Sequence, residues 1–189
     1  MNIIRQTILP GFSGLFLAMG MTGCEPFSFV GSKDSSAYDR IIQDKAAKYG
    51  IDSRLVKAVI WKESRFDSDA VGRHGEIGLM QIMPDQAVVD WARNNRVKIP
   101  SRARLFQPEL NIEIGTWYLS RGIRKYRKYN QAFELALCRY NAGQSRSDKW
   151  APEDRNGNVV KRITISSTRE YVTQIMKRYQ GYCLKKDKN

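Results

Sequence analysis

A glutamate on an apolar helical stripe is the first residue of this sequence that could do chemistry. Glu63 follows Val56, Val59 and Ile60 by seven, four and three residues, and these spacings put the four side chains on one helix face. A carboxylate at the end of a buried stripe is either paired or has a raised pKa, and a general acid needs such a pKa near neutrality. The plainer interpretation is an ion-paired or capping glutamate. Ser64 either orients the carboxylate or satisfies the helix C-terminus.

Two segments further along the chain offer groups that bind sugars. The first is a loop with three glycines, residues 72–78, followed by an apolar segment that contains Met80 and Gln81. Glycines let a backbone approach a ligand closely, and a glutamine side chain both donates and accepts hydrogen bonds. The second is Tyr140–Gly143, which combines an aromatic hydroxyl, an amide and small residues. A plain turn and an Asn/Gly helix cap are the structural alternatives.

The overall composition limits the remaining kinds of chemistry. The chain has 189 residues, one histidine and three cysteines, and the cysteines lie far apart, so we expect an activity without a metal or cofactor. The formal charge of +13 indicates an anionic partner. These charges are scattered through the predicted helices rather than gathered in one arm or recognition helix, so we predict no nucleic-acid binding.

Helical patterns cover most of the chain and predict an all-α fold in a single globular domain. We expect a helix over Asp39–Tyr49 that ends at Gly50 and is capped by Ser36. Further helices are expected after Asp52 or Ser53, from Pro84, from Pro108, over Gln131–Tyr140, and after a capping box at Ser167–Glu170. Strand character is confined to Val159–Ile165, so the fold contains at most a short β-hairpin near residues 154–166.

The N-terminal segment predicts export and lipid attachment. Residues 1–23 carry one charge, followed by an apolar stretch that is too short to span a membrane. A charged start followed by an apolar stretch is typical of an export signal. Cys24 follows Met-Thr-Gly, which resembles a bacterial lipobox. We therefore predict a signal peptide (1–23), a lipidated Cys24, a tether (24–37), a globular domain (38–183) and a basic tail (184–189). An ordinary secretory signal or a short membrane anchor is the alternative.

This leader also predicts where the protein works. A lipid on Cys24 would hold the protein at a membrane of the cell envelope, facing the periplasm and at the outer membrane where the cell has one. In that oxidising compartment, Cys138 and Cys183 either form a disulfide or remain free thiols.

Taken in order, the motifs resemble the soluble lytic transglycosylase family, which has a goose-lysozyme-like fold. The resemblance covers residues 38–180, including segments 105–112 and 115–119, and its motifs are Glu63-Ser64, Gly78-Leu79-Met80-Gln81, Tyr140-Asn141-Ala142-Gly143 and Arg169-Glu170-Tyr171-Val172. Two features depart from the family pattern. Ser167 stands where a glutamate is usual, and Arg139 flanks the third motif, where it either favours anionic peptides or points to solvent.

The resemblance implies cleavage of the β-1,4 bond between MurNAc and GlcNAc in peptidoglycan, with 1,6-anhydro-MurNAc ends. Glu63 would be the acid and then the base, since substrate-assisted glycosidases need no second carboxylate. The substrate-binding residues would be Ser64, Gly78, Met80, Gln81, Tyr140, Asn141 and Tyr171. The partners would be glycan strands and, through its lipid, a membrane; we expect a monomer.

Two other functions remain open at this point. A muramidase would hydrolyse the same bond with a second carboxylate, for which Asp67, Asp69 and Glu76 are the candidates. A lipoprotein that binds peptidoglycan or scaffolds a secretion apparatus would keep the cleft and lose the acid.

Overall fold

The structure, a computed structural model, describes residues 34–186. The predicted signal peptide, Cys24, most of the tether and the end of the basic tail lie outside these residues. Within the described range, no helix is both long and apolar enough to cross a bilayer.

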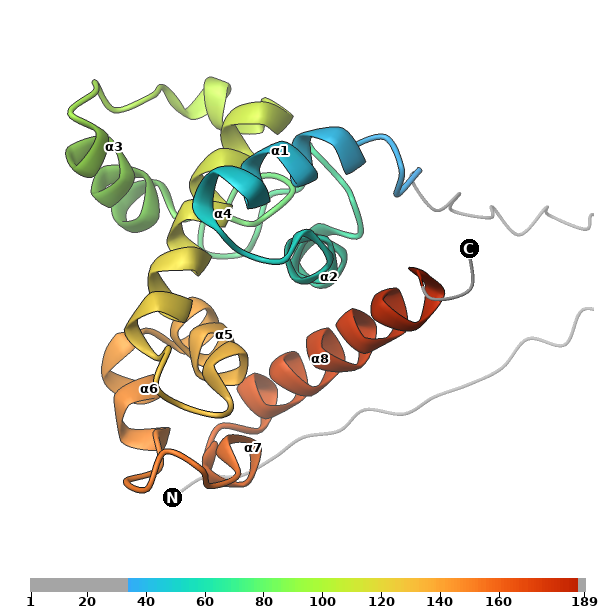
Figure 1. The fold of residues 1–189 in the computed structure, drawn as a ribbon. Helices are drawn as coiled ribbons and strands as arrows, with labels where there is room; N and C mark the ends of the chain where they lie inside the picture. The colour runs from blue at the N-terminus through green and yellow to red at the C-terminus, as the bar shows by residue number, and fades with distance from the viewer. Residues whose placement is uncertain (1–33, 187–189) are drawn as a thin grey trace, which may run out of the picture. The chain divides into compact units, whose positions relative to one another are not determined.

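The fold is built from helices, which confirms the predicted all-α class (Figure 1). Residues 34–186 contain no β-sheet, only two isolated antiparallel bridges. The elements are α1 (Asp39–Tyr49), α2 (Ser53–Ser64), the π-helical turn η1 (Pro84–Val88), α3 (Val89–Asn95), the 3-10 turn η2 (Arg102–Phe106), α4 (Pro108–Lys125), α5 (Ala132–Ala142), α6 (Gln144–Trp150), α7 (Val159–Arg162) and α8 (Ser166–Lys186).

Local sequence signals explain several helix boundaries. Helix α1 ends at Gly50, whose φ of 66° lies in the left-handed region that suits glycine. Asp52 caps α2, because its side chain accepts a hydrogen bond from the backbone N–H of Arg54 at 2.9 Å. Pro84 and Pro108 begin η1 and α4. Proline lacks a backbone N–H, and at the first position of a helix that N–H would have no partner within the helix.

The predicted strand character over Val159–Ile165 is wrong. This segment begins with the short helix α7, and Asn158 caps it by accepting a hydrogen bond from the N–H of Lys161 at 3.0 Å. The β-branched residues Val159 and Ile163 are fully buried in the core. They pack there without forming a strand of a sheet.

Both predicted serine caps are also wrong. The Ser36 hydroxyl donates to Asp34 at 2.7 Å, and α1 begins without a side-chain cap. Helix α8 begins at Ser166, before the expected cap at Ser167, and Glu170 accepts a hydrogen bond from Gln174 instead of closing a capping box. Ser36 and Glu170 therefore each bond another side chain instead of the end of a helix.

The two cysteines of the described chain are free thiols. Cys138 is buried in α5, and burial raises its pKa to about 12, which makes the thiol unreactive. Cys183 is half-buried on α8.

Helix α4 is the central element of the fold. It packs against α1 and α5, while α2 packs against α1 and α8, and α5 also contacts α6 and α8. Figure 1 shows α4 running from the neighbourhood of α1 and α3 to that of α5 and α6. Every residue from Asn111 to Trp117 is buried, so the middle of this helix is enclosed on all sides.

A buried charge on α4 is neutralised by α1. Glu113 is 6% exposed and forms ion pairs with Lys45 at 2.8 Å and Lys48 at 2.6 Å, while the Tyr49 hydroxyl donates to it. Burial pushes the pKa of Glu113 upward, but the hydrogen bonds from these three residues outweigh burial and lower it. A buried carboxylate is tolerated when it is paired in this way.

Close packing of Met80 on α4 yields a stability prediction. A Cβ at Gly115 would lie 2.5 Å from the Met80 sulfur, so Gly115→Ala is expected to destabilise the fold by about 1–3 kcal/mol through overpacking. Gly181→Ala is the matched control, because a Cβ there meets nothing within 4 Å and should add up to about 1 kcal/mol of helix stability. Urea denaturation of the two variants measures both; equal effects would contradict the prediction.

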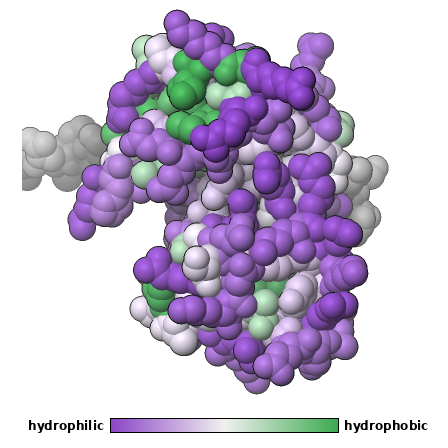
Figure 2. Space-filling model, turned by 90° about the vertical axis from the view of Figure 1, so that its left-hand side faces the viewer, coloured by the Kyte–Doolittle hydropathy of each residue, from purple (hydrophilic) through white to green (hydrophobic). Residues whose placement is uncertain are grey.

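The face of the molecule drawn in Figure 2 is predominantly polar. Hydrophilic side chains cover most of the face in Figure 2, and an apolar patch interrupts them at the upper end, where α3 lies in Figure 1. Val97 and Ile99, 48% and 54% exposed, follow α3 and alternate with Arg96 and Lys98.

Candidate active site

Glu63 lies in the last turn of α2, where this helix packs against α8. Tyr171 of α8 donates a hydrogen bond from its hydroxyl to Glu63 Oε1 at 2.6 Å, although the two residues are 108 positions apart. Tyr171 is 5% exposed, whereas Glu63 is half-buried. The structure thus brings together the predicted acid and the predicted tyrosine of the closing motif.

Opposing influences set the protonation of this pair. Burial is the largest influence and raises the pKa of Glu63 from 4.5 to about 7, and the charge of Glu76 acts in the same direction. The hydrogen bond from Tyr171 and the charge of Lys62 lower this pKa. Burial and the Glu63 charge raise the pKa of Tyr171 well above its usual value, so the phenol remains a donor. A carboxyl with a pKa near 7 can both give and take a proton at neutral pH.

Removing the Tyr171 hydroxyl should shift the pH dependence of any reaction that needs protonated Glu63. In Tyr171→Phe the anionic carboxylate loses a donor, so the pKa of Glu63 rises. We expect the alkaline limb of the pH–rate profile to move upward by about one unit, the equivalent of one hydrogen bond to a charged group. Tyr140→Phe is the control, because the Tyr140 hydroxyl bonds a backbone carbonyl; an equal shift in both variants would contradict this role.

The raised pKa of Glu63 also predicts a pH-dependent stability. The folded pKa of about 7 exceeds the ordinary 4.5, so the favourable contribution of the protonated form is complete below pH 4.5 and is lost as the pH rises through 7. Glutamine does not ionise. We expect Glu63→Gln to match the wild type in unfolding free energy near pH 4 and to exceed it by about 2–3 kcal/mol above pH 8. Urea denaturation across this range tests it; a difference independent of pH would contradict it.

Two hydroxyl groups hold the backbone of the Gly78–Gln81 segment from different helices. Ser64 of α2 donates to the carbonyl of Leu79 at 2.9 Å, and Tyr140 of α5 donates to the carbonyl of Met80 at 2.8 Å. Ser64 therefore positions the loop; its other recorded hydrogen bond goes to Ile60 in its own helix, at 3.4 Å. The segment lies between α2, which carries Glu63, and α5.

A buried asparagine on α4 completes the support of this loop. Asn111 is fully buried; its Oδ1 accepts from the N–H of Met80 at 2.8 Å, and its Nδ2 donates to the carbonyls of Ile77 and Leu105 at 2.9 and 2.7 Å. Sequence reasoning missed this role. An amide within an apolar helical run, next to Ile112, was the available signal, because a buried amide must be satisfied.

The glycine of the segment is required where it stands. Gly78 has a φ of 71°, and a Cβ there would lie 2.5 Å from Asn111 Nδ2. Its N–H donates to the carbonyl of Ala70 at 2.8 Å. Gly78 thus allows the loop to approach α4, and any side chain would displace the asparagine that holds it.

Two further residues of this loop were expected to bind substrate. Met80 is fully buried, with its sulfur 3.9 Å from the Thr116 hydroxyl, so its side chain packs in the core. Gln81 has a φ of 45°, and its Nε2 donates to the carbonyls of Ala70 and Gly78 at 3.2 and 3.0 Å. Its amide nitrogen is therefore engaged within the loop. Gln81 also lines a small pocket together with Ile82, Met83, Gln86, Ala87, Tyr118 and Tyr140.

The end of α5 presents one amide at the surface. Asn141 is exposed, and its Oδ1 accepts a hydrogen bond from the buried Thr168 hydroxyl at 2.8 Å. Arg139 does not point to solvent: it is 9% exposed, its guanidinium carbon lies 4.4 Å from the Tyr118 ring centroid, and it donates to the Tyr118 carbonyl. Ser167 is exposed on the first turn of α8.

Other carboxylates lie in the loop after α2. Glu76 is close enough to affect the pKa of Glu63, and its carboxylate accepts a hydrogen bond from the N–H of His74 at 2.9 Å. Asp69 is exposed and its N–H donates to Asp67. Residues 34–186 hold no group of three histidine, cysteine, aspartate or glutamate side chains arranged to bind a metal ion.

The structure thus shows an all-α domain in which Glu63, a glutamate with a raised pKa, lies where α2 packs against α8. Residues 40–162 match the family described as the transglycosylase SLT domain, and the chain belongs to this family. The match includes Glu63 and Tyr140, whereas Tyr171 lies beyond it.

The curated relatives share the sequence of this domain. The chain is 38% identical over 89 residues to membrane-bound lytic murein transglycosylase C of Yersinia pestis (strain Pestoides F) and to the protein of the same name from Yersinia pseudotuberculosis. The alignment covers 47% of this chain and 25% of each relative. The chain thus matches about a quarter of the length of these proteins.

Solved structures share its fold. An inactive mutant of the lytic transglycosylase Slt from Pseudomonas aeruginosa superposes with a TM-score of 0.69 at 28% identity, over 80% of this chain and 24% of that one. The 70-kDa soluble lytic transglycosylase of Escherichia coli, also solved in complex with bulgecin A, gives a TM-score of 0.67 at 26% identity, over 78% and 24%.

Proposed function

We propose that the protein is a peptidoglycan lytic transglycosylase that cleaves the β-1,4 bond between MurNAc and GlcNAc and leaves 1,6-anhydro-MurNAc ends. The observation that carries this proposal is Glu63, whose pKa of about 7 and hydrogen bond to Tyr171 suit a single acid and base. Membership of the transglycosylase SLT domain family and the names of the relatives support the substrate.

The reaction follows from one carboxyl that changes its protonation state twice. Protonated Glu63 donates its proton to the glycosidic oxygen as the bond between that oxygen and muramyl C1 breaks. The resulting carboxylate accepts the proton of the muramyl 6-hydroxyl as its oxygen bonds to C1. Glu63 ends protonated, as it began, and no water is consumed. Tyr171 stabilises the anionic state between these steps.

The remaining motif residues divide into two groups in this proposal. Tyr171, Tyr140, Asn141 and Gln81 border the substrate, with the exposed amide of Asn141 contacting sugar hydroxyl or acetamido groups. Ser64, Gly78 and Met80 act through the loop backbone that they hold or form, as their hydrogen bonds and packing support. No step requires a metal or cofactor.

The cellular setting is also a proposal. We infer that Cys24 is lipidated after removal of residues 1–23 and that the domain acts as a monomer from a membrane surface, facing the periplasm. The words "membrane-bound" in the name of the relatives support an envelope location.

Mass spectrometry of the soluble products tests the proposed reaction. The protein without residues 1–24 is incubated with purified peptidoglycan, and the muropeptides released are analysed. Anhydro-muramyl products, lighter by one water than hydrolysis products, are expected. Reducing-end products would instead indicate a muramidase, with Glu76 as the first candidate for its second carboxylate. Binding to sacculi without any product would indicate a scaffold.

A further inference from the structure

The chain between α3 and η2 exposes apolar side chains that the core does not use. Four large hydrophobic residues are strongly exposed within residues 34–186. Two of them, Val97 and Ile99, lie two positions apart here, in residues 96–99, which we call the basic–apolar loop; Val71 and Leu184 stand singly. A single exposed apolar residue is ordinary, whereas a group of them on one short loop indicates a contact surface.

The end of α3 leaves Val97 only partly covered. The N–H of Arg96 donates to the carbonyl of Arg93 at 3.2 Å, and the N–H of Val97 donates to that of Ala92 at 3.0 Å. This pair of bonds is the Schellman motif, in which the residue after the left-handed one usually packs against the last helical turn. Val97 occupies that position, yet it remains 48% exposed. Its remaining apolar surface has no cover within residues 34–186.

The same part of the chain carries positive charge without a carboxylate. Residues 91–108 contain no aspartate or glutamate and five lysine or arginine residues, all of them exposed: Arg93, Arg96, Lys98, Arg102 and Arg104. Among the ion pairs within residues 34–186, only Arg93 has a carboxylate partner, Asp90 at 3.9 Å. Four cations at this end of the domain are therefore not neutralised by the fold.

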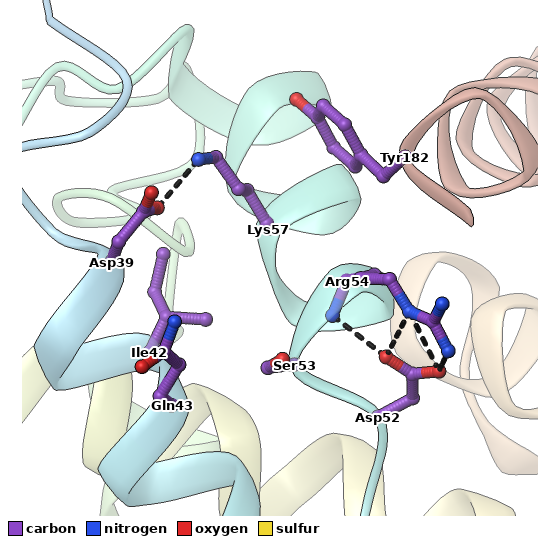
Figure 3. A pocket seen from close by; sticks show the side chains of 8 residues that line it. All are labelled: Asp39, Ile42, Gln43, Asp52, Ser53, Arg54, Lys57 and Tyr182. Carbon is purple, nitrogen blue, oxygen red and sulfur yellow. Dashed lines mark hydrogen bonds and ion pairs between the residues drawn. The ribbon is translucent and has the colours of Figure 1, made fainter. Parts of the chain in front are cut away.

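The cavity between α1 and α2 shows the opposite arrangement. It has a volume of 530 Å³, and both of its cations pair with carboxylates of the cavity itself: Lys57 with Asp39, and Arg54 with Asp52 (Figure 3). Charges that are already paired give no preference for an anionic partner. The four cations of residues 91–108 do, because like charges along a short segment repel each other and an anionic surface removes that repulsion.

Cationic side chains that alternate with apolar ones fit the surface of a membrane with anionic lipids. Each lysine or arginine near such a surface tightens binding about fivefold, and apolar side chains between them enter the boundary of the acyl chains. A protein partner fits less well. A stable protein interface buries about 1,600 Å², and the loop contributes only two apolar side chains to such an area.

Buried residues fix both ends of the basic–apolar loop to the core. Ala92 and Leu105 are each 1% exposed, and Asn111 of α4 donates to the Leu105 carbonyl at 2.7 Å. Helix α3, which precedes the loop, directly follows η1, and η1 lines the small pocket that contains Gln81 and Tyr140. A contact made by this loop therefore orients the domain and its site.

We propose that the basic–apolar loop binds the surface of an anionic phospholipid membrane. Val97 and Ile99 insert between the lipids. Arg96 and Lys98 bind the lipid phosphate groups. This contact is separate from the acyl chains proposed for Cys24: those hold the protein at the membrane, and the loop determines which side of the domain faces it. The inference rests on the envelope location in the proposed function, since it takes the membrane from there, and is independent of the cleavage reaction.

Co-sedimentation with vesicles tests the proposal on the protein without residues 1–24, which has no acyl chain. The buried core lies within residues 42–175, so this protein keeps the domain. The vesicles contain either phosphatidylcholine alone or phosphatidylcholine and phosphatidylglycerol in equal amounts. We expect about 25-fold tighter binding to the anionic vesicles, as two cations that contribute about fivefold each would give.

Two double substitutions separate the apolar from the charged contribution. Val97→Ser with Ile99→Ser should weaken binding to the anionic vesicles about tenfold, as expected for two partly inserted apolar side chains. Arg96→Gln with Lys98→Gln should weaken it about 25-fold. All four side chains are exposed, so both variants should fold, and urea denaturation checks this.

Matched substitutions elsewhere on the surface are the controls. Val71→Ser with Leu184→Ser removes apolar side chains of similar exposure. Arg127→Gln with Lys128→Gln removes two exposed cations just beyond the far end of α4. Neither pair should change vesicle binding by more than about twofold, because charges beyond about 10 Å from the bilayer are screened.

Three results would overturn the inference. The first is equal binding of both kinds of vesicle by the wild type, and the second is an equal loss in loop and control variants. The third is a dimer that Val97→Ser with Ile99→Ser disperses, without vesicle binding, which would make the loop a contact between copies of the chain. Loss of vesicle binding with normal release of muropeptides would leave the proposed reaction standing, and vesicle binding without any release would overturn that reaction alone.

Discussion

The Glu63→Gln protein is expected to release anhydro-muropeptides about 10³-fold more slowly than the wild type, in the range typical for loss of a general acid–base group. Glutamine can still accept the hydrogen bond from Tyr171, so the geometry around the site is retained while the transferable proton is lost. The measurement is the initial rate of muropeptide release from purified peptidoglycan at pH 6, where a group with a pKa of about 7 is largely protonated.

Glu134→Gln is the matched control for this experiment. Glu134 is a half-buried glutamate on α5 whose pKa is also raised by burial, so its replacement makes the same chemical change away from Tyr171. Its rate should remain within about twofold of the wild type, as expected for a carboxyl outside the reaction. Equal losses in both variants, or full activity of Glu63→Gln, would contradict the assignment of the acid.

The second large effect is expected on stability, from Asn111→Leu. Leucine has a similar volume but leaves the N–H of Met80 and the carbonyls of Ile77 and Leu105 without the bonds that Asn111 provides. Each buried group without a partner is worth about 1–3 kcal/mol, so we expect a loss of about 3–5 kcal/mol in unfolding free energy. Urea denaturation measures this loss.

Asn95→Ala is the control for the asparagine prediction. Asn95 also donates from its amide to a backbone carbonyl, that of Trp91 at 2.8 Å, but it is exposed. Water can replace that bond, so the loss should stay below about 1 kcal/mol. Comparable losses at the two positions would show that the buried amide does not hold the loop.

The sequence predicts helices best where the signal is local. Gly50 and Asp52 fix the end of α1 and the start of α2 by their own backbone and side-chain chemistry. The segment at Val159 has β-branched residues that favour a strand, and only the core that they enter makes it helical. Helix α6 (Gln144–Trp150) is short and polar, so no periodic pattern announces it.

The site follows the same division. Residue types and spacing identify Glu63, and the family resemblance adds Tyr171, but their contact depends on the packing of α2 against α8. Periodicity does not apply to an irregular loop, which is why the burial of Met80 could not be predicted from its position in the chain. The burial of Arg139 could not be predicted either, because a charged residue is usually exposed. Its guanidinium is buried because it stacks on the ring of Tyr118.

The anchoring of the Gly78–Gln81 segment affects how the protein unfolds and loses activity when heated. Loops commonly open before the core does, and their amide hydrogens then exchange early. Here the N–H of Met80 donates to Asn111 of the central helix α4. The carbonyl of Leu79 accepts a hydrogen bond from α2, and the carbonyl of Met80 accepts one from α5. That amide should exchange as slowly as those of α4, and catalytic activity should decline along the same temperature curve as global unfolding.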